Sequence, residues 1–117
     1  MSFAEALKTN KGLEKFNFYG NEMTSRTLMV LAAAIKEFSS GSLTEINLGK
    51  NQLNDKGGVK LGEALKFNNS IVKLNLSDND LTDETALAIN RNLLFSKTLD
   101  EVNLTKNLIN LRVIEMV

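Results

Sequence analysis

The sequence predicts a right-handed α/β solenoid, in which a parallel sheet forms the concave side and helices cover the convex side. The first observation is a motif of five residues that returns four times. In its second copy it reads Leu43, Ile46, Leu48, Asn51 and Leu53. The second observation is the spacing, because the asparagine of this motif recurs at a nearly constant period of about 28 residues. A fixed period of this length indicates stacked units that share one hydrophobic core.

We therefore expect a single domain that spans residues 1–117. It divides into a helical half-repeat (1–12), three repeats (13–42, 43–70 and 71–98) and a partial repeat (99–117).

Each repeat is expected to open with a short strand. In the second repeat, Ile46 and Leu48 point to one side. Glu45 and Asn47 point to the other, which is the alternation of a strand with one buried face. The other repeats carry the same alternation at equivalent positions.

The second half of each repeat has the spacing of an amphipathic helix. Apolar residues recur at helical intervals in the segments 28–38, 59–67 and 86–95, which include Phe38, Phe67, Leu87 and Phe95. Thr82 and Asp83 can cap the start of the last of these helices. The pair Gly57 and Gly58 is expected to permit close packing where the middle helix begins against its neighbour.

One asparagine of each repeat follows the strand, where the chain turns sharply. These residues are Asn21, Asn51, Asn79 and Asn107. A buried carboxamide there can satisfy backbone groups that the turn leaves unpaired, and it can also bridge to the next repeat. We assign the four asparagines a structural role and not a ligand-binding role.

The motif and the helix that follows it resemble the leucine-rich repeat family, in its ribonuclease-inhibitor-like class. The helical part of that pattern reads here Leu53, Gly57, Leu61, Ala64 and Leu65. Members of this class include ribonuclease inhibitors, Ran GTPase-activating proteins, tropomodulin-type actin-capping domains and the sensor ends of NOD-like receptors. The resemblance implies binding to another macromolecule through the concave face and its rim loops. By analogy alone, it also suggests a regulator of a small GTPase or of actin.

Outward positions of neighbouring strands should form columns across the sheet, because parallel strands lie about 4.7–4.9 Å apart. One column carries charge of alternating sign: Lys15, Glu45, Lys73 and Glu101. The next contains only amides: Asn17, Asn47, Asn75 and Asn103. Two further columns vary in type: Tyr19, Gly49, Ser77 and Thr105, and then Gly20, Lys50, Asp78 and Lys106.

Two interpretations of these columns stay open. In one, the amides hydrogen-bond along their row and the charges pair across strands, so the first two columns are structural. In the other, the columns are a polar recognition surface, in which Tyr19 either anchors a partner or covers an open end of the stack. The candidate partner-binding residues are Lys15, Asn17, Tyr19, Glu45, Asn47, Lys50, Lys73, Asn75, Asp78, Glu101, Asn103 and Lys106.

Composition argues against several other functions. Fourteen basic and 14 acidic side chains cancel, so the chain lacks the positive surplus of a nucleic-acid-binding protein. Without Cys or His, it lacks the usual nucleophile, general base and zinc ligands. The acidic segment 77–84 does not have the spacing of a calcium loop, and residues 57–62 do not have the order of a phosphate-binding loop. We expect no enzyme activity, metal, cofactor or small-molecule substrate.

The N-terminal segment has no long apolar core of a secretory signal, and no apolar run approaches the length of a membrane span. Glycosylation sequons occur at Asn68, Asn75 and Asn103, but two of them fall on expected strands. These features favour a cytoplasmic, intracellular protein that does not bind membranes.

The ends of the sequence fall within helical halves of the repeat. Segment 3–7 is equivalent to 61–65, and segment 110–117 is equivalent to 54–61. Apolar residues would then be presented at both ends of the stack. We expect either a fragment of a longer array or self-association through the ends, head to tail or back to back. A structural, self-assembling segment without an external ligand is therefore the alternative to a partner-binding module.

Overall fold

Four short strands form one parallel sheet, in the order β1-β2-β3-β4. Residues 14–37 and 43–109 are the part of the chain that the computed structural model describes. The strands are β1 (Lys15–Asn17), β2 (Glu45–Asn47), β3 (Lys73–Asn75) and β4 (Glu101–Asn103). Each of the strands β1 to β3 pairs with the strand that follows it in the sequence, and the first residues of paired strands are aligned with each other. The predicted strands and their order are thus confirmed.

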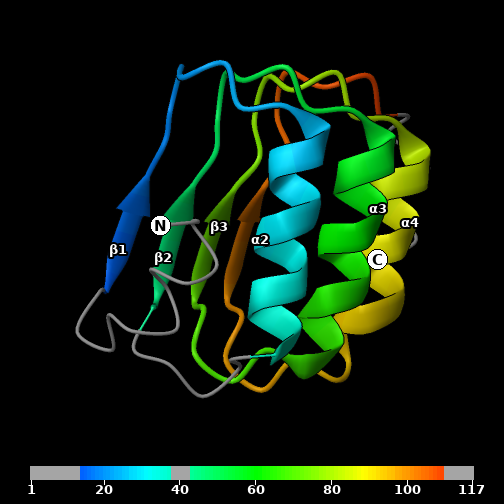
Figure 1. Ribbon diagram of the computed structural model, residues 1–117. Helices are drawn as coiled ribbons and strands as arrows, with labels where there is room; N and C mark the ends of the chain where they lie inside the picture. Colours follow the sequence, from blue (N-terminus) through cyan, green and yellow to red (C-terminus); the bar gives the residue numbers. More distant parts are fainter. Residues whose placement is uncertain (1–13, 38–42, 110–117) are drawn as a thin grey trace.

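In the described part of the chain, three helices lie side by side on one face of this sheet (Figure 1). They are α2 (Ser25–Glu37), α3 (Asp55–Ala64) and α4 (Asp83–Leu93), and the 3-10 turn η1 (Leu65–Phe67) continues α3. Thr82 caps α4 as expected, because its side chain accepts a hydrogen bond from the Glu84 N–H. The sheet and the layer of helices together confirm the predicted α/β solenoid.

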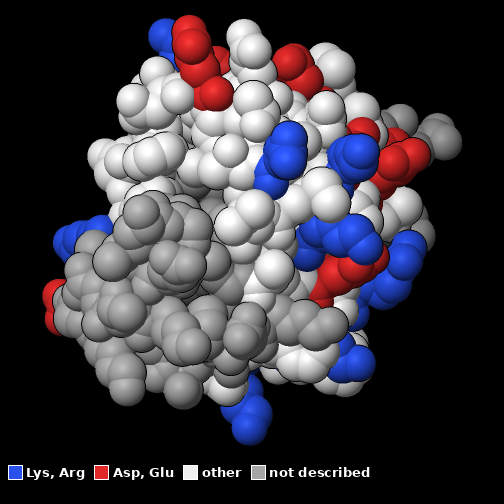
Figure 2. Space-filling model, in the orientation of Figure 1, with Lys and Arg blue, Asp and Glu red and all other residues white. Residues whose placement is uncertain are grey.

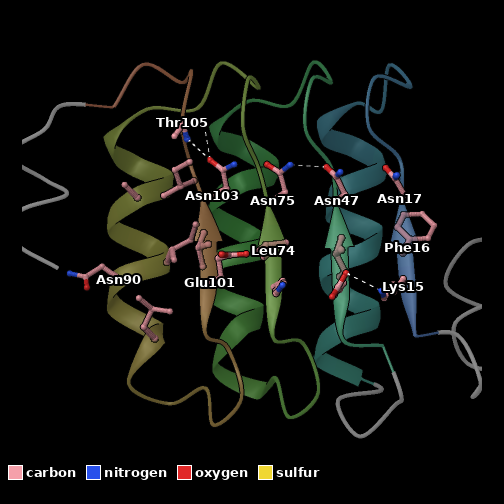
Figure 3. Close-up of a pocket in the computed structure, with 18 residues that line it drawn as sticks. Lys15, Phe16, Asn17, Asn47, Leu74, Asn75, Asn90, Glu101, Asn103 and Thr105 are labelled. Atoms are coloured by element: carbon pink, nitrogen blue, oxygen red, sulfur yellow. Dashed lines mark hydrogen bonds and ion pairs between the residues drawn. The ribbon is translucent and has the colours of Figure 1, made fainter.

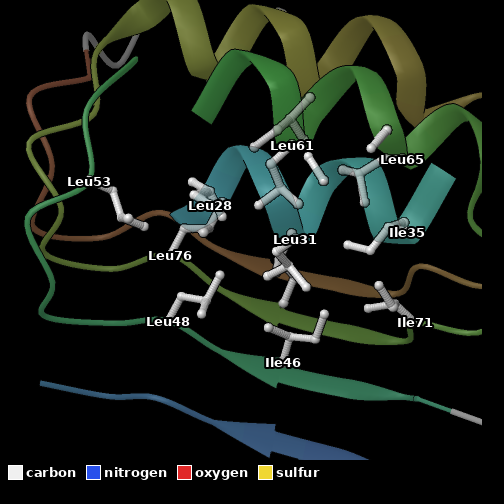
Figure 4. Close-up of a cluster of buried hydrophobic side chains, with 14 of the residues drawn as sticks. Leu28, Leu31, Ile35, Ile46, Leu48, Leu53, Leu61, Leu65, Ile71 and Leu76 are labelled. Carbon is white, nitrogen blue, oxygen red and sulfur yellow. The ribbon is translucent and has the colours of Figure 1, made fainter. Parts of the chain in front are cut away.

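The hydrophobic core fills the space between the sheet and the helices (Figure 4). Ile46 and Leu74 point inward from the central strands, and Leu48 and Leu76 follow them two positions later; all four are at most 2% exposed. Leu28, Leu31 and Leu61 meet them from the helices. Full burial of one such side chain contributes about 1.5–3 kcal/mol, so stacking supplies each repeat with the core that it cannot form alone.

Glycines let the helices approach one another closely. A Cβ atom on Gly58 would lie 2.2 Å from Thr85 Oγ1, and one on Gly57 would lie 2.9 Å from the Ser25 carbonyl oxygen. Both glycines belong to the first turn of α3. The expected close packing at the start of the middle helix is therefore present on both of its sides.

Three apolar residues with helical spacing lie outside the core. Phe67, Leu87 and Phe95 are 41%, 37% and 54% exposed. Phe67 belongs to the 3-10 turn and Phe95 follows the end of α4, so neither continues the geometry of its helix. Helical spacing in the sequence therefore does not by itself place these three side chains in the core. Phe38 and the two terminal half-helices lie outside the described residues.

Candidate functional site

The inward asparagines hold the turns that follow the strands. The Asn79 side chain is fully buried, and its Nδ2 donates hydrogen bonds to the carbonyl oxygens of Leu48, Leu76 and Ser77 at 2.8–3.1 Å. Its Oδ1 accepts a hydrogen bond from the backbone N–H of Asn51 at 2.9 Å. One carboxamide therefore satisfies four backbone groups, two of them in the preceding repeat.

The same arrangement recurs on either side of Asn79. Asn51 donates to Phe18 O, Leu48 O and Gly49 O and accepts from the N–H groups of Asn21 and Met23. Asn107 Oδ1 accepts from the N–H groups of Asn79 and Leu81. Each of these amides forms hydrogen bonds with the preceding repeat. The turns that lead from the strands to the helices are therefore joined to one another by hydrogen bonds.

The outward asparagines form a row across the four strands (Figure 3). We call this set the amide row; it comprises Asn17, Asn47, Asn75 and Asn103. Each Oδ1 accepts a hydrogen bond from the backbone N–H two residues later, at 2.9–3.0 Å. Asn75 Nδ2 also donates to Asn47 Oδ1 at 3.0 Å. The oxygens are thus occupied by the chain itself, and the amide groups are held in fixed orientations.

Beside the amide row lies a charge column that consists of Lys15, Glu45, Lys73 and Glu101, aligned by strand register. Lys15 Nζ lies 3.8 Å from Glu45 Oε2, and both side chains are solvent-accessible. Within the described residues, Lys73 and Glu101 form no ion pair. Cross-strand pairing therefore accounts for half of this column and leaves two exposed charges for other partners.

A groove of about 990 Å³ is lined by the amide row and the charge column together with apolar residues of the strands and of α4: Phe16, Ile46, Leu74, Val102, Leu104, Ala86, Ile89 and Leu93. The groove crosses all four strands and reaches Asn90 on α4 (Figure 3). Among the predicted binding residues, it brings together the following set: Lys15, Asn17, Glu45, Asn47, Lys73, Asn75, Glu101 and Asn103. Tyr19, Lys50, Asp78 and Lys106 do not line it and lie beyond it, after the carboxyl ends of the strands.

Tyr19 packs on a glycine of the next repeat. A Cβ atom on Gly49 would lie 2.8 Å from Tyr19 Cδ2 and 3.0 Å from Ser77 Oγ. The ring is nevertheless 50% exposed. The variation in this column therefore has a steric cause at Gly49, and an accessible aromatic surface remains beside the groove.

The outermost column has an unusual backbone. It consists of Gly20, Lys50, Asp78 and Lys106, and we call it the rim column. Their φ angles are 69°, 52°, 56° and 58°, in the left-handed region. This conformation is unfavourable by about 1–2 kcal/mol for a residue that has a Cβ atom. The sequence analysis did not predict the left-handed backbone of the rim column, although the glycine at position 20 was a signal that this column needs a positive φ.

A second polar cluster joins the starts of α3 and α4. The Asp55 carboxylate accepts hydrogen bonds from Thr82 N at 2.9 Å, from Thr82 Oγ1, and from Thr85 Oγ1 at 2.7 Å. Burial acts to raise the pKa of Asp55, but the hydrogen bonds from Thr82 and Thr85 outweigh burial and leave the pKa below its ordinary value of 3.8. These partners are all structural, so we do not assign this cluster to the binding surface.

Charged side chains elsewhere are mixed in sign. Basic and acidic residues are interspersed over the face that Figure 2 shows. Within residues 14–37 and 43–109, no three acidic side chains lie close enough together to hold a metal ion. In the same part of the chain, none of the helices combines the length and apolar character that a bilayer crossing requires.

Comparison with known proteins agrees with this geometry. A family model described as Leucine Rich repeat matches residues 40–62 and 67–89. The two matched segments, less than half of the chain, are thus similar to leucine-rich repeats. No curated protein sequence matches the chain.

One solved structure with a similar fold is described as "Leiomodin-1 Actin-Binding Site 2 (ABS2)". It superposes with a TM-score of 0.84 at 22% sequence identity and covers 97% of this chain. The present chain spans only 66% of that one. At this identity the likeness concerns the fold.

Proposed function

We propose that the domain is a protein-interaction module that docks a partner through its concave face and rim loops. The observation that carries this proposal is the groove of about 990 Å³, which is lined by the amide row, the charge column and apolar side chains of the strands and α4. Lys73 and Glu101 are exposed in it without an ion pair inside the described chain. A rigid sheet with unpaired charges is suited to select a partner by complementary charge.

The leiomodin likeness suggests the first partner to test. The name of that solved domain assigns actin binding to leiomodin-1, and we propose actin as the first candidate here. The period of about 28 residues favours the ribonuclease-inhibitor-like class of repeats. Both proposals are compatible with a cytoplasmic protein and with a domain that belongs to a longer leucine-rich repeat protein.

The test compares partner recovery by two double variants. Tyr19→Ala with Lys50→Glu alters the exposed aromatic and one rim charge. Phe67→Ala with Lys60→Glu makes the same two kinds of change on the helical side. We expect the first pair to reduce recovery of cross-linked partners, or co-sedimentation with actin, at least tenfold, and the second pair to leave both unchanged. Equal recovery by the wild type and both variants would remove Tyr19 and Lys50 from the docking surface, and equal recovery by Lys73→Glu with Glu101→Lys as well would remove the concave face from consideration.

A second candidate function is self-association. Leu94 and Leu108, in the last described repeats, are 91% and 70% exposed, which is unusual for leucine. We propose that such apolar surface mediates contact between copies. Sedimentation velocity at rising concentration tests it: Leu94→Glu with Leu108→Glu should lower the average mass if copies associate. A wild-type protein that stays monomeric at high micromolar concentration would refute this candidate.

A further inference from the structure

The charges around the groove form an ordered pattern. Along the charge column, the sign alternates from each strand to the next. The rim column repeats the alternation with the opposite phase: Glu45 shares its repeat with Lys50, Lys73 with Asp78, and Glu101 with Lys106. Backbone hydrogen bonds from Lys50 N to Ser77 O and from Asp78 N to Thr105 O keep the rim in the register of the strands. The amide row lies between two charge columns of opposite phase.

The rim charges occur at a conformational cost. Lys50, Asp78 and Lys106 occupy the left-handed region at the position where the first repeat has Gly20. All three side chains are exposed, and in the described part of the chain none of them forms an ion pair. The left-handed conformation also occurs at Glu22 and Asp80, so the turn requires it, and the rim charges are those of its residues that continue the columns of the sheet. No ion pair within residues 14–37 and 43–109 uses the charges of these three side chains.

We infer that the concave face takes an α-helix of the partner, laid along the amide row, with charges of alternating sign on its flanks. This inference rests on the proposed function of the concave face. It adds the secondary structure and the charge pattern of the segment that docks.

The spacing of the strands selects a helix over an extended segment. Three steps between neighbouring strands of about 4.8 Å make about 14 Å. Positions i, i+3, i+7 and i+10 on one side of a helix span about 15 Å, at 1.5 Å per residue. Alternate residues of an extended chain, i to i+6, span about 20 Å. A helix can therefore keep four charges in register with four strands, whereas an extended segment loses register by about one strand.

The width of the surface between the charge column and the rim column also fits a helix. The charge column and the rim column are five residues apart in each repeat, which is at most about 17 Å of extended chain. A helix with its side chains is about 10–12 Å wide. It fits between the columns and lies over the amide row, while its flanking side chains reach the charges on both sides.

The experiment uses synthetic peptides of about 16 residues, which form between four and five helical turns, locked as helices by a hydrocarbon staple on the outer side. One peptide carries Glu, Lys, Glu and Lys at i, i+3, i+7 and i+10. A second has the same composition with its charges in blocks (Glu, Glu, Lys, Lys). A third, unstapled peptide has the alternating charges and a central proline that prevents a helix. Dissociation constants are measured by calorimetry at low salt, and the contact face is mapped by amide NMR shifts.

Exposed charge pairs each change affinity about two- to fivefold. We therefore expect the alternating helix to bind about tenfold more tightly than the block and proline peptides, with shifts centred on the amide row. Lys73→Glu with Glu101→Lys keeps the net charge but breaks the alternation, and it should abolish this preference. Lys60→Glu with Glu63→Lys reverses an ion pair of α3, and this control should keep it.

Equal binding of the alternating and block helices, or tighter binding of the proline peptide, would overturn the inference. So would shifts confined to the helical side. These outcomes are separable from failure of the proposed function, because recovery of partners by the Tyr19 and Lys50 variant is measured without any peptide. Loss of that recovery together with equal peptide binding would keep the docking face and reject the helix.

Discussion

Replacement of Asn79 by alanine tests the amide network that holds the repeats together. The substitution removes three donated hydrogen bonds and one accepted hydrogen bond from a site that is fully buried. Each backbone group left unpaired costs about 1–3 kcal/mol. A water in the vacated space can restore two of the four bonds, so we expect a loss of about 2–6 kcal/mol. A domain of this size has a total stability of about 6–18 kcal/mol.

The matched control is Asn21→Ala, at the equivalent position of the first described repeat. The Asn21 side chain is exposed and, within the described residues, donates one hydrogen bond, to Tyr19 O at 3.1 Å. We expect its replacement to cost less than about 1 kcal/mol. Urea unfolding followed by circular dichroism gives both free energies of unfolding. If the two variants differ by less than about 0.5 kcal/mol, the range of an ordinary surface substitution, the carboxamides do not support the fold in the way that their hydrogen bonds imply.

Three further predictions concern stability. Asp55→Asn should destabilise the domain at pH 7, because the lowered pKa of Asp55 means that its ionised form is favoured by folding. That contribution is present above the ordinary value of 3.8 and disappears as the pH falls through the lower folded value, so urea midpoints of the two proteins should converge in strong acid. Lys50→Gly should raise the free energy of unfolding by up to about 1 kcal/mol, because glycine adopts the positive φ without strain. Lys60→Gly, inside α3, should lower it by about 1 kcal/mol. Chemical denaturation of the two variants measures both changes. Gly58→Ala should lower stability by about 1–3 kcal/mol despite the better helix propensity of alanine, because its Cβ would overlap Thr85, and an unchanged thermal midpoint would contradict this packing.

Much of the fold could be read from single positions and their period. The alternation around Ile46 and Leu48 indicates which strand face is buried, and it does so in every repeat because equivalent residues have equivalent neighbours. The position of Asn79 directly after a strand indicated that its carboxamide would meet turn backbone. Both inferences depend only on local geometry and on repetition.

Features that depend on contacts between different repeats were not predictable in the same way. Gly49 is small because the Tyr19 ring, from the preceding repeat, occupies the space of its side chain. Phe67 has helical spacing, but the change from α3 to a 3-10 turn places it outside the core. Sequence pattern reports the type of residue at a position. It does not report the neighbouring ring that explains Gly49 or the change of backbone conformation that exposes Phe67.

The structure separates the residues that stabilise the solenoid from those available for recognition. Inward asparagines satisfy the turn backbone from the core side, and outward asparagines bind their own backbone through Oδ1. The neighbouring Lys73 and Glu101 then have no structural ion-pair partner within the described chain. Exchange of such exposed charges should alter stability by less than about 0.5 kcal/mol while it changes the pattern that a partner meets. The alternation places opposite charges at directly opposed strand positions, which favours the sheet, and we propose that the charges without an ion pair also serve recognition.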